Sequence, residues 1–165
     1  MQKITYITEN SKQTQKLGET LAKELKGGEI ICLVGELGGG KTTFTQGFLK
    51  GLKVKGPYTS PTFLVIKNYK KEISISKSQI PNKSQNPKSK TLPTGRQVQN
   101  IYHIDTYRIN AQDIINLGWE EMVADKKNII IIEWADRIKK IIPKNSLWIE
   151  FSWVDEKKRK ITLKD

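Results

Sequence analysis

The segment GELGGGKT, at positions 35–42, constrains the fold of this chain more than any other part of its sequence. It matches the pattern G-x-x-x-x-G-K-[ST] at every fixed position. Glycine dominates such a turn because phosphate oxygens must approach successive backbone N–H groups that side chains would block. An apolar run at 30–34 precedes the segment, as in a strand buried on both faces, and an amphipathic helical pattern follows over 41–52. A strand, a glycine-rich turn and a helix in this order predict a phosphate site at the helix N-terminus.

The residue types within this segment suggest separate roles. Lys41 is expected to meet the terminal phosphates as a point charge and to act in catalysis, and the Thr42 hydroxyl is expected to bind Mg²⁺. Thr43 is a second hydroxyl that could reach the metal or the γ-phosphate. The glycines expected to contact the ligand are Gly35, Gly38, Gly39 and Gly40.

Two carboxylates close apolar runs farther along the chain, Asp105 at the end of IYHID and Glu133 at the end of NIIIIE. The carboxyl ends of neighbouring parallel strands open onto one crevice, so both side chains are expected to face the phosphates. There they would hold Mg²⁺ or orient the attacking water, and we predict both as metal-binding and catalytic residues. The turn Ser60-Pro61-Thr62 lies where a switch loop could close, which would bring Thr62 near the metal or γ-phosphate.

Apolar periodicity predicts an alternation of strands and helices along the rest of the chain. Strands are expected at 4–7, 30–34, 63–67, 101–105 and 128–134, and helices at 11–27, 41–52, 111–123 (broken near Gly118) and 135–142. Residues 147–153 and 160–163 alternate around a charged turn, which favours an antiparallel hairpin. The expected fold is one α/β domain over 1–165. It is a three-layer sandwich like that of P-loop NTPases, with a mostly parallel sheet and a C-terminal antiparallel hairpin.

Composition argues against several other classes. The longest unbroken apolar run is Ile30–Val34, whereas a membrane span needs about 20 residues, so no membrane contact is expected. The N-terminus lacks the apolar stretch of a secretory signal, which favours a cytoplasmic location. Cys32 is the single cysteine, so no disulfide partner is expected, and the single histidine, His103, argues against a Cys/His zinc site.

The chain is basic, with 29 Lys and Arg residues against 17 Asp and Glu and a formal charge of +12. Seven of the basic residues lie at about 70–100, where Glu72 is the single acidic residue and Ser, Asn, Gln and Pro are frequent. Such a composition cannot bury enough apolar surface to offset its ordering entropy, so this stretch is predicted to be a mostly disordered insertion. It could touch RNA, but a solvated loop has the same composition, and the charge supports nucleic-acid binding only weakly.

Histidine and tryptophan carry weaker signals. His103 lies inside a predicted strand and is expected to pack in the core rather than to act in catalysis. Trp134 follows Glu133 directly, where it either stacks near a nucleotide or partner or fills the core. The remaining tryptophans are expected to pack: Trp119, Trp148 and Trp153.

The ordered segments GELGGGKTTFTQGFLKGL, SPTFLVIKNY, IYHIDTYRI, GWEE and IIIIEWADRI resemble the bacterial TsaE (YjeE-like) proteins. The glycine-rich pattern alone is shared by many families, whereas the ordered set of SPTF, HIDTYR and EWAD is far more specific. The resemblance runs from about 11 to 153 and skips the stretch 70–100. It implies a small Mg²⁺-dependent ATPase of tRNA threonylcarbamoyladenosine synthesis that acts with TsaB and TsaD. In that family ATP hydrolysis resets the complex between turnovers, and tRNA is an indirect partner.

The same resemblance implies roles for further residues. Ser11, at the predicted helix start, and Lys158 and Arg159, in the basic hairpin turn, lie where similar proteins approach the nucleotide. Trp134 is expected beside the nucleotide. There are two departures from similar sequences. Ala135 stands where proline is frequent, and the stretch 70–100 is longer than usual, which leaves partner docking on that side open.

Other functions remain as alternatives. A small-molecule kinase could use the same loop, but the arginines that would form its lid are scattered: Arg96, Arg108, Arg137 and Arg159. No Asn/Thr-Lys-x-Asp tetrad supports a GTPase. The hypothesis of a non-enzymatic RNA-binding module would rest on the net positive charge and the basic stretch alone. The sequence has none of the aromatic-rich strand patterns of proteins that bind single-stranded RNA on a sheet. Since no arginine finger is evident, activity alone is expected to be low and a partner is expected to trigger turnover.

Overall fold

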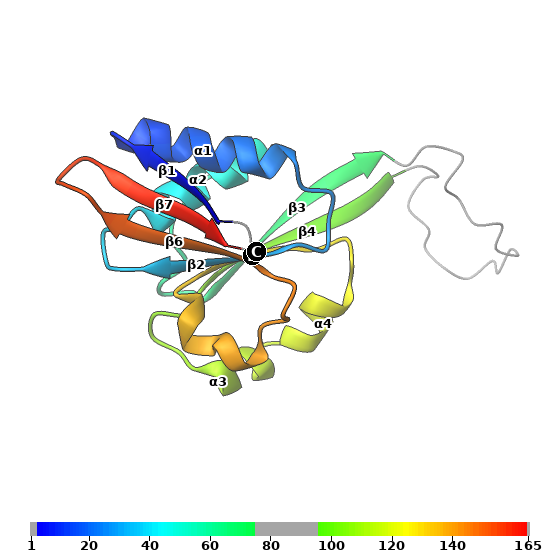
Figure 1. Ribbon diagram of the computed structural model, residues 1–165. Helices are drawn as coiled ribbons and strands as arrows, with labels where there is room; N and C mark the ends of the chain where they lie inside the picture. Colours follow the sequence, from blue (N-terminus) through cyan, green and yellow to red (C-terminus); the bar gives the residue numbers. More distant parts are fainter. Residues whose placement is uncertain (1–2, 75–95, 165) are drawn as a thin grey trace, which may run out of the picture.

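Strands with continuous apolar runs form the centre of the fold, as the sequence pattern predicts. The computed structural model describes residues 3–74 and 96–164, and their strands lie in one sheet in the order β1-β7-β6-β2-β5-β4-β3 (Figure 1). The strands are β1 (Lys3–Thr8), β2 (Ile30–Gly35), β3 (Ile66–Ser74), β4 (Arg96–Asp105), β5 (Ile129–Glu133), β6 (Leu147–Trp153) and β7 (Arg159–Lys164). The helices are α1 (Ser11–Lys23), α2 (Lys41–Gly51), α3 (Ala111–Asn116), α4 (Trp119–Ala124) and the 3₁₀ helix η2 (Ala135–Ile141).

The middle of the sheet is parallel and its two sides are antiparallel. Strands β6, β2, β5 and β4 run parallel to one another, β7 and β1 continue antiparallel on one side, and β3 pairs antiparallel with β4 on the other. Helices α1 and α2 cover one face, and α3, α4 and η2 cover the other (Figure 1). The structure therefore confirms the predicted three-layer α/β sandwich with the C-terminal hairpin β6-β7.

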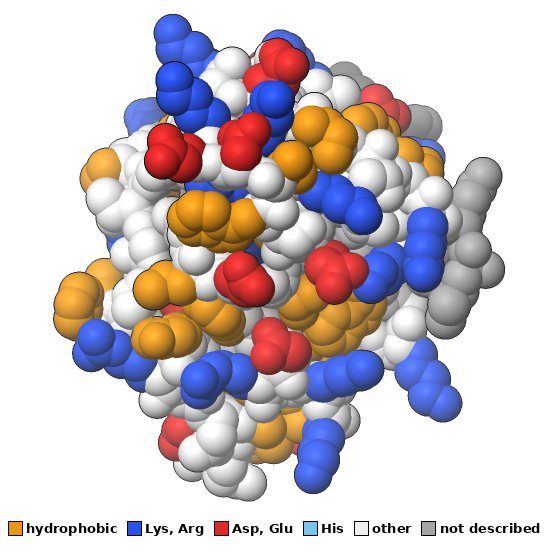
Figure 2. Space-filling view, turned by 60° about the vertical axis from the view of Figure 1, so that its left-hand side comes forward, with side chains coloured by type: hydrophobic (Ala, Val, Ile, Leu, Met, Phe, Trp, Pro, Cys, Tyr) orange, Lys and Arg blue, Asp and Glu red, His pale blue; other side chains and the backbone are white. Residues whose placement is uncertain are grey.

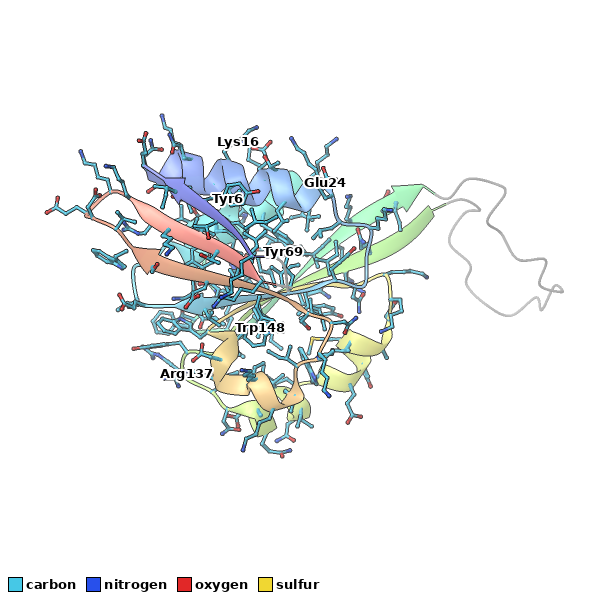
Figure 3. All side chains as sticks on the ribbon, in the orientation of Figure 1. Tyr6, Lys16, Glu24, Tyr69, Arg137 and Trp148 are labelled. Carbon is cyan, nitrogen blue, oxygen red and sulfur yellow. The ribbon has the colours of Figure 1, made fainter. Side chains whose placement is uncertain are left out.

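Each face of the sheet has its own hydrophobic core. Leu33 and Ile131 face the side of α1 and α2, where they join Phe44 and Phe48. Cys32 and its neighbours on β5 face the opposite side. Because β2 and β5 are buried on both faces, every residue of their apolar runs packs into one of the two cores. In Figure 3, Lys16 projects outward from α1 and Glu24 lies just after its last residue, whereas Trp148 lies on the opposite side of the sheet.

Helices α1 and α2 approach closely because glycines line their contact. A Cβ atom at Gly47 would lie 1.9 Å from the backbone oxygen of Gln15, and one at Gly18 would lie 2.3 Å from that of Phe44. Any side chain at either position would push the helices apart. The contact sets α1 directly against α2, the helix that follows the glycine-rich segment.

One predicted strand begins later than expected. The carbonyl of Pro61 accepts from the N–H groups of both Leu64 and Val65, and Val65 has a φ of 64°. The chain therefore turns at these residues, and β3 starts at Ile66. The expectation of a strand over 63–67 is wrong for its first residues, and the Phe63 side chain is 85% exposed.

Strands β3 and β4 extend into the stretch predicted to be an insertion. Residues 70–74 pair antiparallel with 96–100, and the ladder ends with Ser74 opposite Arg96. The prediction of a mostly disordered stretch is therefore wrong at both ends of 70–100, because backbone pairing satisfies main-chain groups whatever the side chains are. The remainder of that prediction, 75–95, lies outside the described residues.

The segment after β5 is helical, as predicted. Residues 135–141 form a 3₁₀ helix, with Ile138 departing from helical geometry at φ −117°. The helical region 111–123 breaks at Gly118, as expected, where φ is 91°. Among the described residues, no helix is long and apolar enough to cross a membrane.

Candidate functional site

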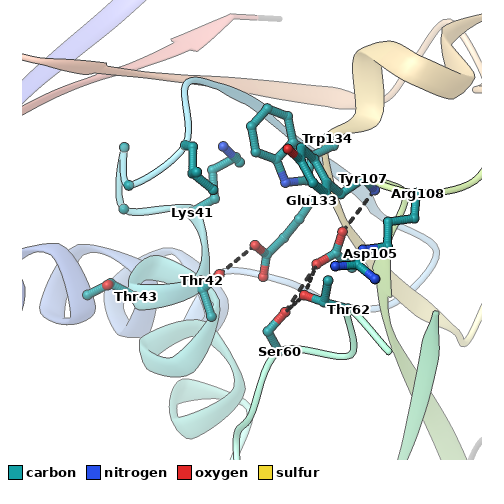
Figure 4. A pocket seen from close by; sticks show the side chains of 14 residues that line it. Lys41, Thr42, Thr43, Ser60, Thr62, Asp105, Tyr107, Arg108, Glu133 and Trp134 are labelled. Atoms are coloured by element: carbon teal, nitrogen blue, oxygen red, sulfur yellow. Dashed lines mark hydrogen bonds between the residues drawn. The ribbon is translucent and has the colours of Figure 1, made fainter. Parts of the chain in front are cut away.

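A pocket of about 320 Å³ opens where β2, β4 and β5 end, the position predicted from the sequence (Figure 4). We call it the main pocket. It lies between the glycine-rich loop (residues 35–42) with the start of α2, the ends of β4 and β5, and the turn before β3. Its lining consists of Leu37, Gly38, Gly39, Gly40, Lys41, Thr42, Thr43, Ser60, Thr62, Asp105, Tyr107, Arg108, Glu133 and Trp134. Four predicted site residues lie outside this lining: Ser11, Gly35, Lys158 and Arg159.

The glycine-rich loop contains several glycines with positive φ, two of which lie in the lining of the main pocket. Gly38 and Gly40 have φ values of 73° and 102°, in the left-handed region that favours glycine. A Cβ atom on Gly38 would also lie 3.1 Å from the Trp153 ring. Gly40 is the residue that caps α2, and the first N–H groups of a helix have no intrahelical acceptor. The loop and helix start are therefore suited to an anionic ligand.

The Lys41 side chain lies against the loop from which it comes. Its Nζ donates to the carbonyl oxygens of Gly35 at 2.7 Å and Glu36 at 2.8 Å, and it lies 3.5 Å from the centre of the Trp134 ring. Burial lowers the pKa of the Lys41 ammonium because it disfavours the charged form, although Glu133 and other nearby carboxylates act in the opposite direction. An anion in the main pocket would add a further counter-charge next to this lysine.

Asp105 is fixed at the end of β4 by three donors. Its Oδ2 accepts from the Ser60 hydroxyl at 3.1 Å and the Thr62 hydroxyl at 2.7 Å, and its Oδ1 accepts from the Tyr107 N–H at 2.9 Å. Ser60 and Thr62 belong to the turn before β3. The carboxylate therefore ties this turn to the centre of the sheet, with both hydroxyls inside the main pocket.

Glu133 lies beside Asp105 in the register of the parallel pair β4-β5. Its Oε2 accepts from the Thr42 hydroxyl at 2.7 Å, and its Oε1 lies 2.8 Å from Nε2 of His103. The side chain is buried, with 2% of its surface exposed. Glu133 thus links the start of α2 to the end of β5, while Thr43 points to the other side of the helix start (Figure 4).

The donor atoms that meet here are oxygens, the type that Mg²⁺ prefers. They come from the Thr42 hydroxyl and the carboxylates of Asp105 and Glu133. In the part of the chain that the structure describes, no group of three or more His, Cys, Asp or Glu side chains could hold a metal by itself. The set fits an ion such as Mg²⁺, which usually completes its coordination shell with water and phosphate oxygens.

A second pocket, the side pocket, lies on the other side of the glycine-rich loop and has a volume of about 190 Å³. Ser11, Thr43 and Arg159 are in its lining, together with Gly38 and Gly40 of the loop. The Arg159 Nε donates to the Gly38 carbonyl at 3.2 Å, so this side chain supports the loop. Lys158 lies outside both linings, with its Nζ 3.5 Å from Oδ2 of Asp155.

Among the site residues that received no role from the sequence, three in the segment HIDTYR make notable side-chain contacts. His103 packs as predicted, but its ring also reaches Glu133. The Thr106 hydroxyl donates to the Trp134 carbonyl at 2.7 Å, next to the left-handed turn at Trp134, where φ is 62°. Arg108, one of the scattered arginines, lines the main pocket with its guanidinium 5.1 Å from the Phe63 ring. Residues two apart in a strand lie on the same face of the sheet. The spacing of His103 and Asp105 in this segment could therefore have shown that His103 faces the same side as the predicted site residue.

An α/β sheet with a parallel centre, in which β2 leads through a glycine-rich loop into α2, places this protein in the P-loop-like class. Within that class the chain belongs to the TsaE family, because the family profile described as "Threonylcarbamoyl adenosine biosynthesis protein TsaE" matches residues 8–80 and 84–161.

Individual relatives agree with this assignment. The chain is 33% identical to a "tRNA threonylcarbamoyladenosine biosynthesis protein TsaE" of Aquifex aeolicus over 95% of its own length and 92% of the relative's. It is 30% identical to the protein of the same name from Bacillus subtilis over 98% and 85% of the two lengths. A crystal structure of Bacillus subtilis YdiB superposes with a TM-score of 0.69 at 26% identity, covering 98% of this chain and 84% of that one.

Proposed function

We propose that this protein is a Mg²⁺-dependent subunit that binds and hydrolyses ATP and acts with TsaB and TsaD in tRNA threonylcarbamoyladenosine modification. The observation that carries the ATP part of this proposal is the convergence of Lys41, Thr42, Asp105 and Glu133 in one pocket beside the glycine-rich loop. The pathway is inferred from the relatives, which are named for tRNA threonylcarbamoyladenosine biosynthesis.

The two pockets suit different parts of a nucleoside triphosphate. The phosphates would lie along the glycine-rich loop in the main pocket, where backbone donors and the helix dipole favour negative charge. The nucleoside would extend toward the side pocket, which shares Gly38, Gly40 and Thr43 with the main pocket. Lys41 would then leave the carbonyls of Gly35 and Glu36 and meet the terminal phosphates.

The residues opposite the loop provide the remaining chemistry. Thr42, Asp105 and Glu133 would hold the metal, and a carboxylate of this pair can also accept a hydrogen bond from the attacking water. Mg²⁺ held by these residues would neutralise negative charge that develops on the phosphates during phosphoryl transfer. The rim carries Arg108 and the exposed ring of Phe63, so contact with a partner protein at this rim would exclude water from the pocket.

The test is Mg²⁺-ATP hydrolysis by the purified protein, alone and with its TsaB and TsaD counterparts. We expect slow release of phosphate alone, stimulation by the two partners, and no comparable rate with GTP. Lys41→Ala should weaken ATP binding by about 10–100-fold, because its ammonium is the charge expected on the terminal phosphates. Lys50→Ala, on the same helix but at an exposed position, is the matched control and should bind normally.

Other outcomes would favour the alternatives. Unchanged ATP affinity in Lys41→Ala would show that the glycine-rich loop does not bind the phosphates. Phosphate release that is indifferent to TsaB and TsaD would favour a kinase with an unidentified acceptor. Salt-dependent binding of tRNA that ignores ATP would favour an RNA-binding module.

A further inference from the structure

His103 is a buried polar side chain whose hydrogen-bonding capacity is only half used. It is 1% exposed, and Nε2 lies 2.8 Å from Oε1 of Glu133. Its Nδ1 is the one buried side-chain nitrogen or oxygen, among the residues described, that has no hydrogen-bond partner. Burying a polar atom without a partner costs stability, and an apolar side chain such as that of Ile101 would avoid the cost. Packing alone therefore does not explain a histidine at this position.

The register of the sheet explains why the ring reaches Glu133. His103 lies opposite Ile131, and Asp105 lies opposite Glu133, so His103 and Glu133 are diagonal neighbours on the same face of the sheet. On the other side of Glu133 the paired residue is Leu33. The side chains of Ile131 and Leu33 carry no hydrogen-bond donor. His103 is therefore the one side chain among these strand neighbours that can donate to Oε1.

The chemistry of the carboxylate fixes the direction of this bond. An ionised carboxylate has acceptors only, so the proton between the two groups lies on Nε2 of His103, which donates to Oε1 of Glu133. Oε2 accepts from Thr42. One oxygen of Glu133 is thus held from β4 and the other from α2. If a ligand engages Thr42, Oε2 becomes free while His103 continues to hold Oε1.

We propose that His103 is a positioning residue that orients the Glu133 carboxylate, keeping Oε2 directed at Thr42 and the main pocket. This inference deepens the proposed function and rests on it, because the orientation matters only if Glu133 serves a metal–ATP site. His103 itself does not line the main pocket, so its effect would pass entirely through Glu133.

The expected effect separates metal binding from nucleotide binding. Residues that orient metal-binding side chains typically change metal affinity or activity by about 10–100-fold when they are replaced. We expect His103→Leu to weaken Mn²⁺ binding in the presence of a non-hydrolysable ATP analogue, and to lower kcat, each by about 10-fold or more. The KM for ATP should change little, because Lys41 and the glycine-rich loop stay in place.

Two further substitutions test the bond itself. His103→Gln keeps an N–H donor at nearly the reach of Nε2 and should restore most of the Mn²⁺ affinity. His103→Asn is one methylene shorter and should not. Gln99→Leu is the matched control, since Gln99 is a buried polar residue of the same strand whose Nε2 donates to the Lys127 carbonyl at 2.9 Å. It should lower thermal stability without changing Mn²⁺ affinity.

The experiment measures Mn²⁺ binding by electron paramagnetic resonance, with kcat and KM for Mg²⁺-ATP, for the wild-type full chain and these variants. If the wild type binds no Mn²⁺ with the ATP analogue, the proposed function fails, and the role of His103 fails with it. If the wild type binds normally and folded His103→Leu keeps wild-type affinity and kcat, the inference alone is overturned. Equal losses in His103→Gln and His103→Asn would also overturn it, and this pair decides the matter if the leucine variant does not fold.

Discussion

Cys32 lies on the central strand β2 with none of its surface exposed. Burial raises the pKa of the Cys32 thiol to about 12, and a hydrogen bond with Ser146 offsets this only in part. The folded-state pKa lies above the ordinary value of 9.0, so the folded protein holds this proton more tightly than the unfolded chain does. The stability that the neutral thiol contributes is intact below a pH of 9.0 and is lost as the pH rises toward about 12.

The thiol of Cys32 is therefore expected to be inert in the folded protein at neutral and mildly alkaline pH. Ellman's reagent should give no signal in native buffer and one thiol per chain in denaturant, because the reactive thiolate is absent until the core opens. Cys32→Ala should give no signal in either condition. Rapid reaction of the native wild type would contradict the burial of β2.

The site residues differ in how far the sequence could predict them. The glycine-rich motif is enough to predict Lys41 and Thr42 as site residues. Asp105 and Glu133 can be predicted because the carboxyl ends of neighbouring parallel strands lie at the same edge of a sheet. The contact of His103 with Glu133 spans 30 positions and depends on strand register. Periodicity shows which face a side chain occupies, but it does not show which residue of a neighbouring strand lies beside it.

At the scale of elements, the pairing of α1 with α2 brings the two helix starts to the same loop. Thr14 of α1 and Thr43 of α2 both line the side pocket. Their relative position depends on the glycine contacts, in which Gly47 meets the backbone of Gln15 and Gly18 meets that of Phe44. A change in this contact would therefore move one wall of the side pocket.

We expect Gly47→Ala to destabilise the protein by about 1–3 kcal/mol or more, because the added methyl group would overlap the Gln15 backbone oxygen. Thermal unfolding measures the effect directly. Lys50→Ala, on the same helix and exposed, should leave the unfolding midpoint nearly unchanged. A midpoint equal to that of the wild type in Gly47→Ala would show that α1 and α2 are farther apart than in this structure.

The limits of prediction are clearest at the ends of β3 and β4. Phe63 looks like a strand residue because it is apolar, but the turn at Pro61 places it in solvent. Residues 96–100 look like an insertion because they are mostly polar, yet they pair with β3. A strand at the side of a sheet is stabilised chiefly by backbone hydrogen bonds, so side-chain composition identifies it poorly.

At the scale of the whole molecule, the charge of +12 does not form a single basic surface on the face shown in Figure 2. There, basic side chains alternate with acidic and hydrophobic ones. Lys77, Lys83, Lys88 and Lys90 lie in 75–95, where there is no acidic residue. A substantial share of the excess charge therefore belongs to a segment that joins two paired strands.

Because Ser74 lies opposite Arg96, a two-residue turn can join β3 to β4 directly. We expect replacement of 75–95 by Asn-Gly to leave the unfolding midpoint and ATP affinity close to those of the wild type, since the main pocket lies at the other end of these strands. Thermal unfolding with and without Mg²⁺-ATP tests this. A large loss of ATP affinity in a folded variant would show that 75–95 contributes to the site.

The contact between the Lys41 ammonium and the Trp134 ring also has an optical consequence. A cation held 3.5 Å from the centre of an indole ring perturbs its π electrons, and thus its light emission. Any anion that draws the lysine away from the ring removes that perturbation. Trp119 and Trp148 pack on the opposite side of the sheet from α2 and would form a steady background. Trp153, which was expected to pack, is instead 49% exposed and lies beside Gly38, so the measurement is made in a Trp153→Phe background. Trp134 is therefore an intrinsic fluorophore of the main pocket, and the binding of an anion there should change its emission maximum and its quantum yield.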